Sequence, residues 1–444
     1  MLHQLKNKIR TGYSFLIVVG ILFFLSPPLE QQTPEILNSH SYKVGMKIPI
    51  SLPVSPDYHR YHSSLAYDHE HGEFLVVWQQ NYASGVRQIY ARWLNGSGQP
   101  ISSPFQLNPD LPNRQIIPDV VYNATDDEYL VVFMYNYNGD GTTYRIWGKR
   151  VPRSCSVNTC LTQVVANISP EDHAREPSVA WDAIKNRYLV VFDIYDGPAE
   201  SANPNGVLWG CIIAGVVRSQ GTIISSITKP QYSDLAYNPA SEEFLFVWLE
   251  NQTSIKTERH SSSIYPDCIN NVSSFTIKSS SPGWTLSHPS VTTNQQNRYL
   301  VGWEEIPGAG IPGQTPFIKG MELTQSLQWV NDFQLSSGGS GSSLPVFVAN
   351  NAHQEWLAAW QQALPAGDTI LFASWQIGSV PGAANQMGIA AWDNWNARRP
   401  AIAAGKNLPL VIYEGRENNP DVYQHIYGHM LFDSILFMPL VVRQ

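Results

Sequence analysis

The stretch Phe74-Leu75-Val76-Val77-Trp78 decides the fold of this chain, because it recurs seven times with drift. Each copy ends at an aromatic residue, and successive copies are 55, 59, 56, 55, 57 and 53 residues apart. A repeat this regular predicts one array of similar units rather than the three or so separate domains that length alone would suggest. The copies end at Trp78, Phe133, Phe192, Trp248, Trp303, Trp360 and Tyr413.

Each repeat predicts four short antiparallel strands. The first opens with Pro or Ser and a small apolar run, as in 118–122, and the second is the apolar pentapeptide. In six repeats the closing aromatic residue lies 14 or 15 positions after that Pro or Ser, and in the last it lies 13 after, which fits two strands and a tight hairpin. A third strand ends in Ala or Gly, as in Ile89-Tyr90-Ala91, and a fourth closes most units, as in 105–108.

This pattern predicts an all-β, seven-bladed β-propeller of four-stranded antiparallel blades. The pentapeptide is apolar at successive positions, so both faces of its strand must be covered, as they are between neighbouring blades. An open solenoid is the alternative, but it would need polar caps at both ends, and none is visible. The segment Lys47-Ile48-Pro49-Ile50-Ser51 resembles the fourth strands, whereas the seventh repeat is followed by no obvious copy. We therefore expect residues 45–51 to supply the outer strand of blade seven and to close the ring.

Composition restricts the class of partner. Only 14% of the 444 residues are charged, 11% are aromatic, and the net charge is -8. An acidic balance argues against nucleic acid, which requires a basic footprint, and against docking on anionic lipid. The protein is expected to be monomeric, with an extracellular glycan or protein as its partner.

The N-terminal residues resemble an export signal. Lys6, Lys8 and Arg10 precede the apolar run 15–25, which ends at Pro27-Pro28. The uncharged span is just long enough to cross a bilayer, so a cleaved signal and an uncleaved anchor both remain open. Residues 1–28 are expected to be this signal or anchor, 29–44 a linker, 45–434 the propeller and 435–444 a tail. Either reading predicts an extracellular or cell-surface protein.

The four cysteines fit an oxidising compartment. Cys155 and Cys160 lie five positions apart and are predicted to form a local disulfide. Cys211 and Cys268 fall in successive repeats, where a bond between neighbours and two buried free thiols are both open. Zinc is not expected, because no Cys-x-x-Cys and no His pair at ligand spacing occurs.

The repeats resemble a family. Motifs of the form Pro-x-Val-Ala-Tyr, Tyr-Leu-Val-Val-Trp and Ile-Tyr-Gly are similar to those of secreted bacterial β-propeller proteins, most of them uncharacterised, and the resemblance covers roughly 45–431. It implies the fold and transfers no catalytic motif. The tail Phe437–Arg443 resembles the terminal Leu-Pro-Leu-Val-x-Arg segments of exported Chloroflexi proteins, which implies a sorting or surface role at most. An ordinary edge strand on the last blade is the alternative for this tail.

Candidate binding residues gather at one rim. The loops that enter the first strands carry arginines and the histidines at 59, 62, 173 and 288, and acids follow the pentapeptides. Because Arg binds carboxylates bidentately, the sequence predicts a polar, aromatic-lined channel mouth for a sugar or a carboxylated ligand. Structural Arg–acid pairs that tie the loops of each blade are the alternative. The predicted rim set is Arg60, Arg114, Arg175, Asp193, Trp284, Glu304, Trp395, Arg399 and Glu414.

No catalytic residue is assigned. The sequence lacks a Gly-x-Ser-x-Gly elbow, a His-Glu-x-x-His and a phosphate-binding loop. It predicts a non-enzymatic binding or scaffold module for glycan or protein. The alternative is a carbohydrate-active hydrolase, glycosidase-like or sialidase-like, with two acids at the channel mouth.

One loop resembles a calcium site. Asn136, Asn138 and Asp140 place side-chain oxygens at alternate positions before Gly141. Two of the three expected acids are Asn, and no Glu follows at the twelfth position. A calcium loop and a plain Asn/Gly-rich turn therefore both stay open, and no other cofactor is expected.

Overall fold

A computed structural model describes most of the chain from residue 42 onward. The described residues all belong to one compact unit, Ser39–Gln444. The expected signal (1–28), the tail (435–444), Trp395 and the pair Cys155 and Cys160 lie outside them. The described ranges are 42–51, 58–153, 164–169, 171–197, 202–262, 267–308, 311, 314–336, 341–365, 367–382, 386–389, 397–406, 408–415 and 424–433.

The predicted fold is confirmed: seven antiparallel sheets form a ring of blades, and the described residues contain strands without a helix. The first three blades are β3 (Tyr58–Asp68), β4 (Glu73–Tyr82), β5 (Arg87–Asn95) and β6 (Phe105–Gln106); β7 (Gln115–Asn123), β8 (Glu128–Tyr135), β9 (Arg145–Pro152) and β10 (Val164–Val165); and β11 (Ala174–Asp182), β12 (Arg187–Tyr195), β13 (Pro204–Ile213) and β14 (Val216–Ser225).

The next three blades have the same order, from the innermost strand outward. They are β15 (Gln231–Asn238), β16 (Glu243–Glu250), β17 (Ser254–Ser262) and β18 (Ile269–Ser279); β19 (Trp284–Thr293), β20 (Arg298–Pro307), β21 (Phe317–Thr324) and β22 (Trp329–Gln334); and β23 (Ser342–Asn350), β24 (Glu355–Gln362), β25 (Thr369–Gln376) and β26 (Gln386–Gly388).

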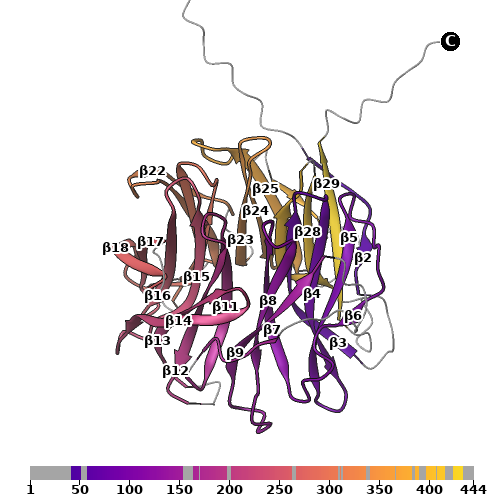
Figure 1. Cartoon of the computed structure of the whole chain (residues 1–444). Helices are drawn as coiled ribbons and strands as arrows, with labels where there is room; N and C mark the ends of the chain where they lie inside the picture. Colours follow the sequence, from indigo (N-terminus) through magenta and orange to yellow (C-terminus); the bar gives the residue numbers. More distant parts are fainter. Residues whose placement is uncertain are drawn as a thin grey trace, which may run out of the picture. The chain divides into compact units, whose positions relative to one another are not determined.

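The seventh blade joins the two ends of the described chain. Its strands β27 (Arg398–Ala404), β28 (Pro409–Gly415) and β29 (His425–Asp433) are completed by β1 (Tyr42–Val44) and β2 (Ile48–Pro49), which both pair with β29. Figure 1 shows the indigo β2 on the same side of the ring as the yellow β29. Closure by an N-terminal strand is therefore confirmed, and it begins at Tyr42, before the expected residue 45. The innermost strands contact one another around the ring, including β27 with β3.

The pentapeptide explains how the blades pack. Phe74, Val76 and Trp78 lie in a cluster with residues of blade seven, whereas Leu75 and Val77 lie in a cluster with residues of blade two. All five are at most 1% exposed. Because side chains alternate along a strand, one pentapeptide contributes to two interblade cores. Two-sided burial of the second strand is the physical basis of the repeat.

Each innermost strand carries a β-bulge that the sequence analysis did not predict. The register shifts at the same place in all seven strands, and one residue there has a positive φ of 43° to 54°. A side chain normally disfavours this left-handed region, so the ring holds seven locally strained residues. We call them the bulge ring: His62, Ile117, Glu176, Tyr232, His288, Leu344 and Arg399.

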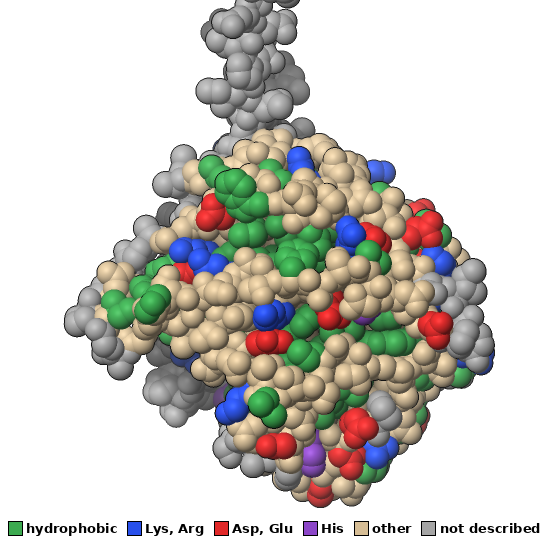
Figure 2. Space-filling model, turned by 90° about the vertical axis from the view of Figure 1, so that its left-hand side faces the viewer, with side chains coloured by type: hydrophobic (Ala, Val, Ile, Leu, Met, Phe, Trp, Pro, Cys, Tyr) green, Lys and Arg blue, Asp and Glu red, His purple; other side chains and the backbone are tan. Residues whose placement is uncertain are grey.

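A disulfide and the outer surface complete the fold. Cys211 on β13 is bonded to Cys268 just before β18, so blades three and four are joined covalently, and the open alternative of free thiols is removed. On the face shown in Figure 2, acidic and basic side chains are interspersed. Within the described residues, no helix is long and apolar enough to cross a membrane.

Candidate functional site

The bulge ring lines one mouth of the central channel. All seven of its residues border a cavity of about 430 Å³. In every blade, the two residues that follow the bulge residue also border this cavity. Five of the seven following residues are proline, which has no N–H to lose where a strand ladder is interrupted. These prolines are the signal in the sequence from which the bulge could have been predicted. They are Pro118, Pro177, Pro289, Pro345 and Pro400.

The residue after each pentapeptide supports the bulge of the next blade. Glu414 accepts the backbone N–H of His62 at 2.6 Å, and Gln79 accepts that of Ile117 at 3.2 Å. The same contact recurs at three further joints between blades, and in the other two the position holds Met134 or Leu249. A side-chain acceptor thus satisfies a backbone donor that the bulge removes from the ladder. The three further pairs are Asp193 with Tyr232, Glu304 with Leu344 and Gln361 with Arg399.

The three acids of the predicted rim set are therefore buried supports. Asp193, Glu304 and Glu414 are each at most 3% exposed. Asp193 also accepts hydrogen bonds from the N–H and hydroxyl of Ser233. Burial, assisted by the charge of Glu176, raises the pKa of Asp193 to about 8, although these hydrogen bonds act in the opposite direction. Burial likewise raises the pKa of Glu414 to about 7.

Arg399 is the predicted arginine that borders the cavity. Its side chain is 45% exposed, and its Nη1 lies 3.6 Å from Oε1 of Glu414. The same Nη1 lies 3.4 Å from Nε2 of His62. Burial and the nearby guanidinium lower the pKa of His62 to about 3, so this imidazole is neutral at physiological pH. One wall of the mouth therefore presents a guanidinium beside a neutral imidazole.

The other predicted arginines lie away from the cavity lining. Arg60 is 0% exposed, and its Nη1 donates to the carbonyl of Tyr58 and contacts Nδ1 of His425. The guanidinium of Arg175 lies over the ring of Tyr195, 4.1 Å from its centroid. In these contacts, the two side chains meet a backbone carbonyl, a histidine and an aromatic ring rather than the acids that the structural alternative expected.

The remaining two described residues of the rim set, Arg114 and Trp284, also lie outside the lining. Arg114 donates to the carbonyl of Gly141 at 3.4 Å, which joins two loops. Trp284 packs against Phe317, with ring centroids 5.1 Å apart. The structure thus brings Arg399 to the cavity and uses the other described members of the set as supports or as contacts between loops.

Glu176 is the site residue that sequence reasoning missed. It stands in the bulge ring with φ at 51° and borders the cavity. Burial raises the pKa of its carboxyl, while His288, Arg175 and Arg399 act in the opposite direction. Next to it in the ring is Tyr232, whose aromatic ring contacts that of His288 with centroids 4.5 Å apart. The mouth therefore places one carboxylate opposite the Arg399 wall.

Ser287, His288 and Glu304 do not form a catalytic triad. The hydroxyl of Ser287 and the carboxylate of Glu304 both contact Nδ1 of His288, at 2.8 Å and 3.2 Å. In a triad the acid and the nucleophile occupy opposite nitrogens of the imidazole, so that the ring relays a proton between them. Here both oxygens compete for one nitrogen, and the group orients the imidazole.

Two aspartates, each two residues after a bulge residue, connect three neighbouring innermost strands by hydrogen bonds. Asp119 accepts from the hydroxyl of Ser64 at 2.8 Å and from the N–H of Val179 at 3.0 Å. Asp234 repeats this with Ser178 at 2.7 Å and Val291 at 2.9 Å. Burial raises the pKa of Asp119 to about 6. Both carboxyls lie on the Glu176 side of the cavity, on blades two and four.

The loop considered for calcium is closed by its own hydrogen bonds. Asp140 accepts from the N–H groups of Thr142 and Thr143, both at 2.7 Å, and from Asn136 at 2.8 Å. The side-chain oxygen of Asn136 accepts the N–H of Gly141, and that of Asn138 accepts the N–H of Asp140. The oxygens that an ion would need are engaged as acceptors. This geometry is that of an Asn/Asp turn.

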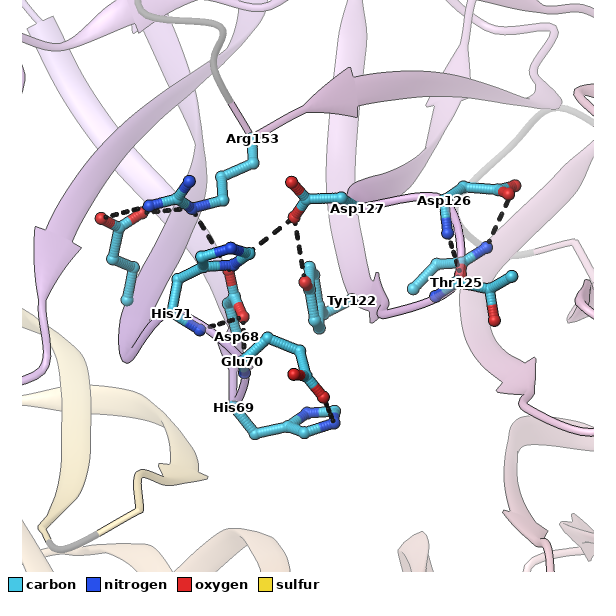
Figure 3. Close-up of polar contacts among 11 residues, drawn as sticks. Asp68, His69, Glu70, His71, Tyr122, Thr125, Asp126, Asp127 and Arg153 are labelled. Carbon is cyan, nitrogen blue, oxygen red and sulfur yellow. Dashed lines mark hydrogen bonds and ion pairs between the residues drawn. The ribbon is translucent and has the colours of Figure 1, made fainter.

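A second cluster of possible metal ligands lies at the turn after β3 (Figure 3). Nδ1 of His71 lies 2.8 Å from Asp68 and 3.6 Å from Asp127. Arg153 already supplies a cation there, with Nε 3.6 Å from Asp68. Asp68 also accepts two N–H groups of its own turn. The same turn position is used in the same way by Asn123, Asp182, Asn238 and Asn294, so this cluster is part of the repeated architecture.

Comparison with known proteins supports the fold and leaves the family open. No family model and no curated protein sequence matches the chain. Among solved structures, the polysaccharide lyase Uly1 is similar with a TM-score of 0.51 and 8% identity, over 88% of this chain and 99% of that one. A protein of unknown function from Dyadobacter fermentans has a TM-score of 0.49 and 10% identity, over 88% and 99% of the two chains. At these identities the likeness concerns the fold alone.

Proposed function

We propose that this propeller is an exported binding module that receives a carboxylated sugar at the channel mouth. The carboxylate is bound by Arg399, with the neutral imidazole of His62 beside it. The partner is accordingly an extracellular acidic glycan. No catalytic step is assigned to the protein.

The observation that carries this proposal is the position of Arg399. Its guanidinium has five N–H donors, and the contacts with His62 and Glu414 both involve Nη1. The half-exposed side chain borders a cavity of about 430 Å³, which falls within the usual size range of small-molecule sites. A planar guanidinium matches a carboxylate in a bidentate geometry, which gives both energy and orientation.

The roles of the acids favour binding over hydrolysis. A glycosidase needs two carboxyl groups that can reach the scissile bond. Asp193, Glu304 and Glu414 are buried and accept backbone N–H groups, so their contacts already have a structural purpose. A polysaccharide lyase shares the fold. That likeness agrees with a glycan partner, but the proposal depends on the residues of this mouth.

Calorimetric titration with a short uronic-acid oligosaccharide tests the proposal. Arg399→Gln is expected to weaken binding at least tenfold, as loss of a charge-assisted bidentate contact implies. Arg398→Gln is the matched control, because that neighbouring arginine is paired with Asp368 at 2.8 Å and lies outside the cavity lining. A neutral oligosaccharide of the same length should bind neither protein. Equal affinity of both variants would contradict the proposal.

The same oligosaccharides should be screened for turnover. If the protein only binds them, the oligosaccharides should be recovered intact. Turnover that is abolished by Glu304→Gln or Asp193→Asn, with the melting temperature unchanged, would overturn it in favour of the hydrolase alternative.

A further inference from the structure

The mouth has two walls of opposite character. Arg399 and His62 stand on blades seven and one, while Glu176 stands on blade three, with Asp119 and Asp234 on the flanking blades. Asp119 and Asp234 are engaged by serine hydroxyls and backbone N–H groups. A ligand that spans the cavity therefore meets a cation at one end and a carboxylate at the other.

Glu176 differs from the other acids at the mouth. Within the described part of the chain, its carboxylate has no hydrogen bond and no salt bridge, although Asp119, Asp193, Asp234, Glu304 and Glu414 are all engaged. Its backbone is held in the left-handed region, which directs the side chain of a bulge residue to the cavity. A charge partly removed from water without a partner is costly.

We propose that the ligand carries a protonated amine as well as a carboxylate, so that the sugar recognised at the mouth is a zwitterionic amino-uronic acid. This inference rests on the proposed function. Glu176 accepts hydrogen bonds from the ammonium group, and the ring of Tyr232 borders the same end of the cavity. An aromatic face attracts a cation, and an ammonium–carboxylate pair neutralises the charge of Glu176.

Three related ligands, which share the uronic acid carboxylate and differ at C2, test the inference on the full-length protein. They are a 2-amino-2-deoxy-uronic acid glycoside, its N-acetyl derivative and the corresponding plain uronic acid. N-acetylation removes the positive charge and keeps the carboxylate. The unmodified protein is expected to bind the free amine at least tenfold more tightly than the N-acetyl form, at a pH where the amine is protonated.

The variant Glu176→Gln should lose this preference and bind the plain uronic acid at least as tightly as the unmodified protein does, because a repelling carboxylate is gone. Glu171→Gln is the matched control, since that exposed acid lies on the loop entering the same strand, and it should retain the preference. Arg399→Gln should weaken binding of all three ligands.

The outcomes separate the two proposals. Equal affinity of the unmodified protein for the amine and its N-acetyl form would overturn the zwitterion inference while uronic acid binding stands. An amine preference that persists in Glu176→Gln would assign the amine to other groups and would also overturn it. If no ligand binds the unmodified protein, the proposed function fails as well. The comparison in the unmodified protein is decisive even if Glu176→Gln does not fold.

Discussion

Ile50 is the residue through which ring closure can be tested most directly. It is 0% exposed and belongs to the cluster formed with blades one and seven. Its Cδ1 packs against Gly428 of β29, where an added Cβ would come within 3.0 Å of it. Ile50→Ala removes three buried carbons from a tight contact, which costs about 3 kcal/mol of unfolding free energy.

This cost is measurable. An unfolding entropy of about 2 cal/mol/K per residue, over a unit of roughly 400 residues, converts 3 kcal/mol into a fall of about 4 °C in melting temperature. Thermal and urea melts of the full chain, followed by tryptophan fluorescence, should detect it. Met46→Ala is the matched control, because that side chain lies in the same segment and is 87% exposed. It should change the unfolding free energy by less than about 0.5 kcal/mol.

A truncation that starts at Ser55 extends the test. It removes Tyr42, Ile48 and Ile50, which are buried, and it takes from Arg92 the carbonyls of residues 49 and 50 as acceptors. Burial of three such side chains stabilises by more than about 5 kcal/mol. If this truncated protein melts at the same temperature as the full chain, closure by the N-terminal strand does not stabilise the ring and the reasoning is wrong.

Three further predictions concern the buried carboxyl of Glu414, the disulfide between blades three and four, and the loop around Asp140. Burial raises the pKa of Glu414 to about 7, so the native state binds a proton more tightly than the unfolded state, and the free energy of unfolding should fall as pH rises from about 4 to about 7. Glu414→Gln keeps a hydrogen-bond acceptor and should flatten this pH profile. An unchanged profile in the variant would contradict the prediction. Replacing Cys211 and Cys268 together with serine opens a link across a sequence separation of 57 and should lower the unfolding free energy by about 4 kcal/mol, seen as sensitivity to reductant that the double variant no longer shows. Millimolar calcium should leave the melting temperature unchanged, because the oxygens of Asp140 are engaged within its loop; a rise that Asp140→Asn removes would instead favour a calcium site.

The architecture could be predicted from the sequence because a strand that is buried on both faces needs an uninterrupted run of apolar residues. Five consecutive apolar residues such as Phe74–Trp78 are accommodated between two layers, and a regular repeat without polar caps at its ends then favours a ring over an open solenoid. Even the closing strand was predictable, because 45–51 has the pattern of a fourth strand without the other three. These inferences use patterns that each repeat carries within its own sequence.

The site was less predictable because its decisive feature is a backbone conformation. The bulge ring consists of His, Ile, Glu, Tyr, His, Leu and Arg, so no residue type marks it. The acids after the pentapeptides were predicted to face a ligand, yet their partners are backbone N–H groups in the next blade. Gln79 and Gln361 fill the same position in other repeats, which indicates that an acceptor is needed there and that its charge is not.

Two joints between blades lack such a side-chain acceptor, and both precede a blade whose bulge residue is ionisable and borders the cavity. Met134 and Leu249 directly follow their pentapeptides, and the bulge residues of the next blades are Glu176 and His288. In the five other joints, a side-chain oxygen of the preceding blade accepts the backbone N–H of the bulge residue. Blades three and five therefore present their ionisable side chains to the cavity from bulges that the general support does not stabilise. Since a repeat departs from its pattern where another requirement dominates, blades three and five are where the amine end of the ligand should be recognised, opposite the wall that Arg399 and His62 form on blades seven and one.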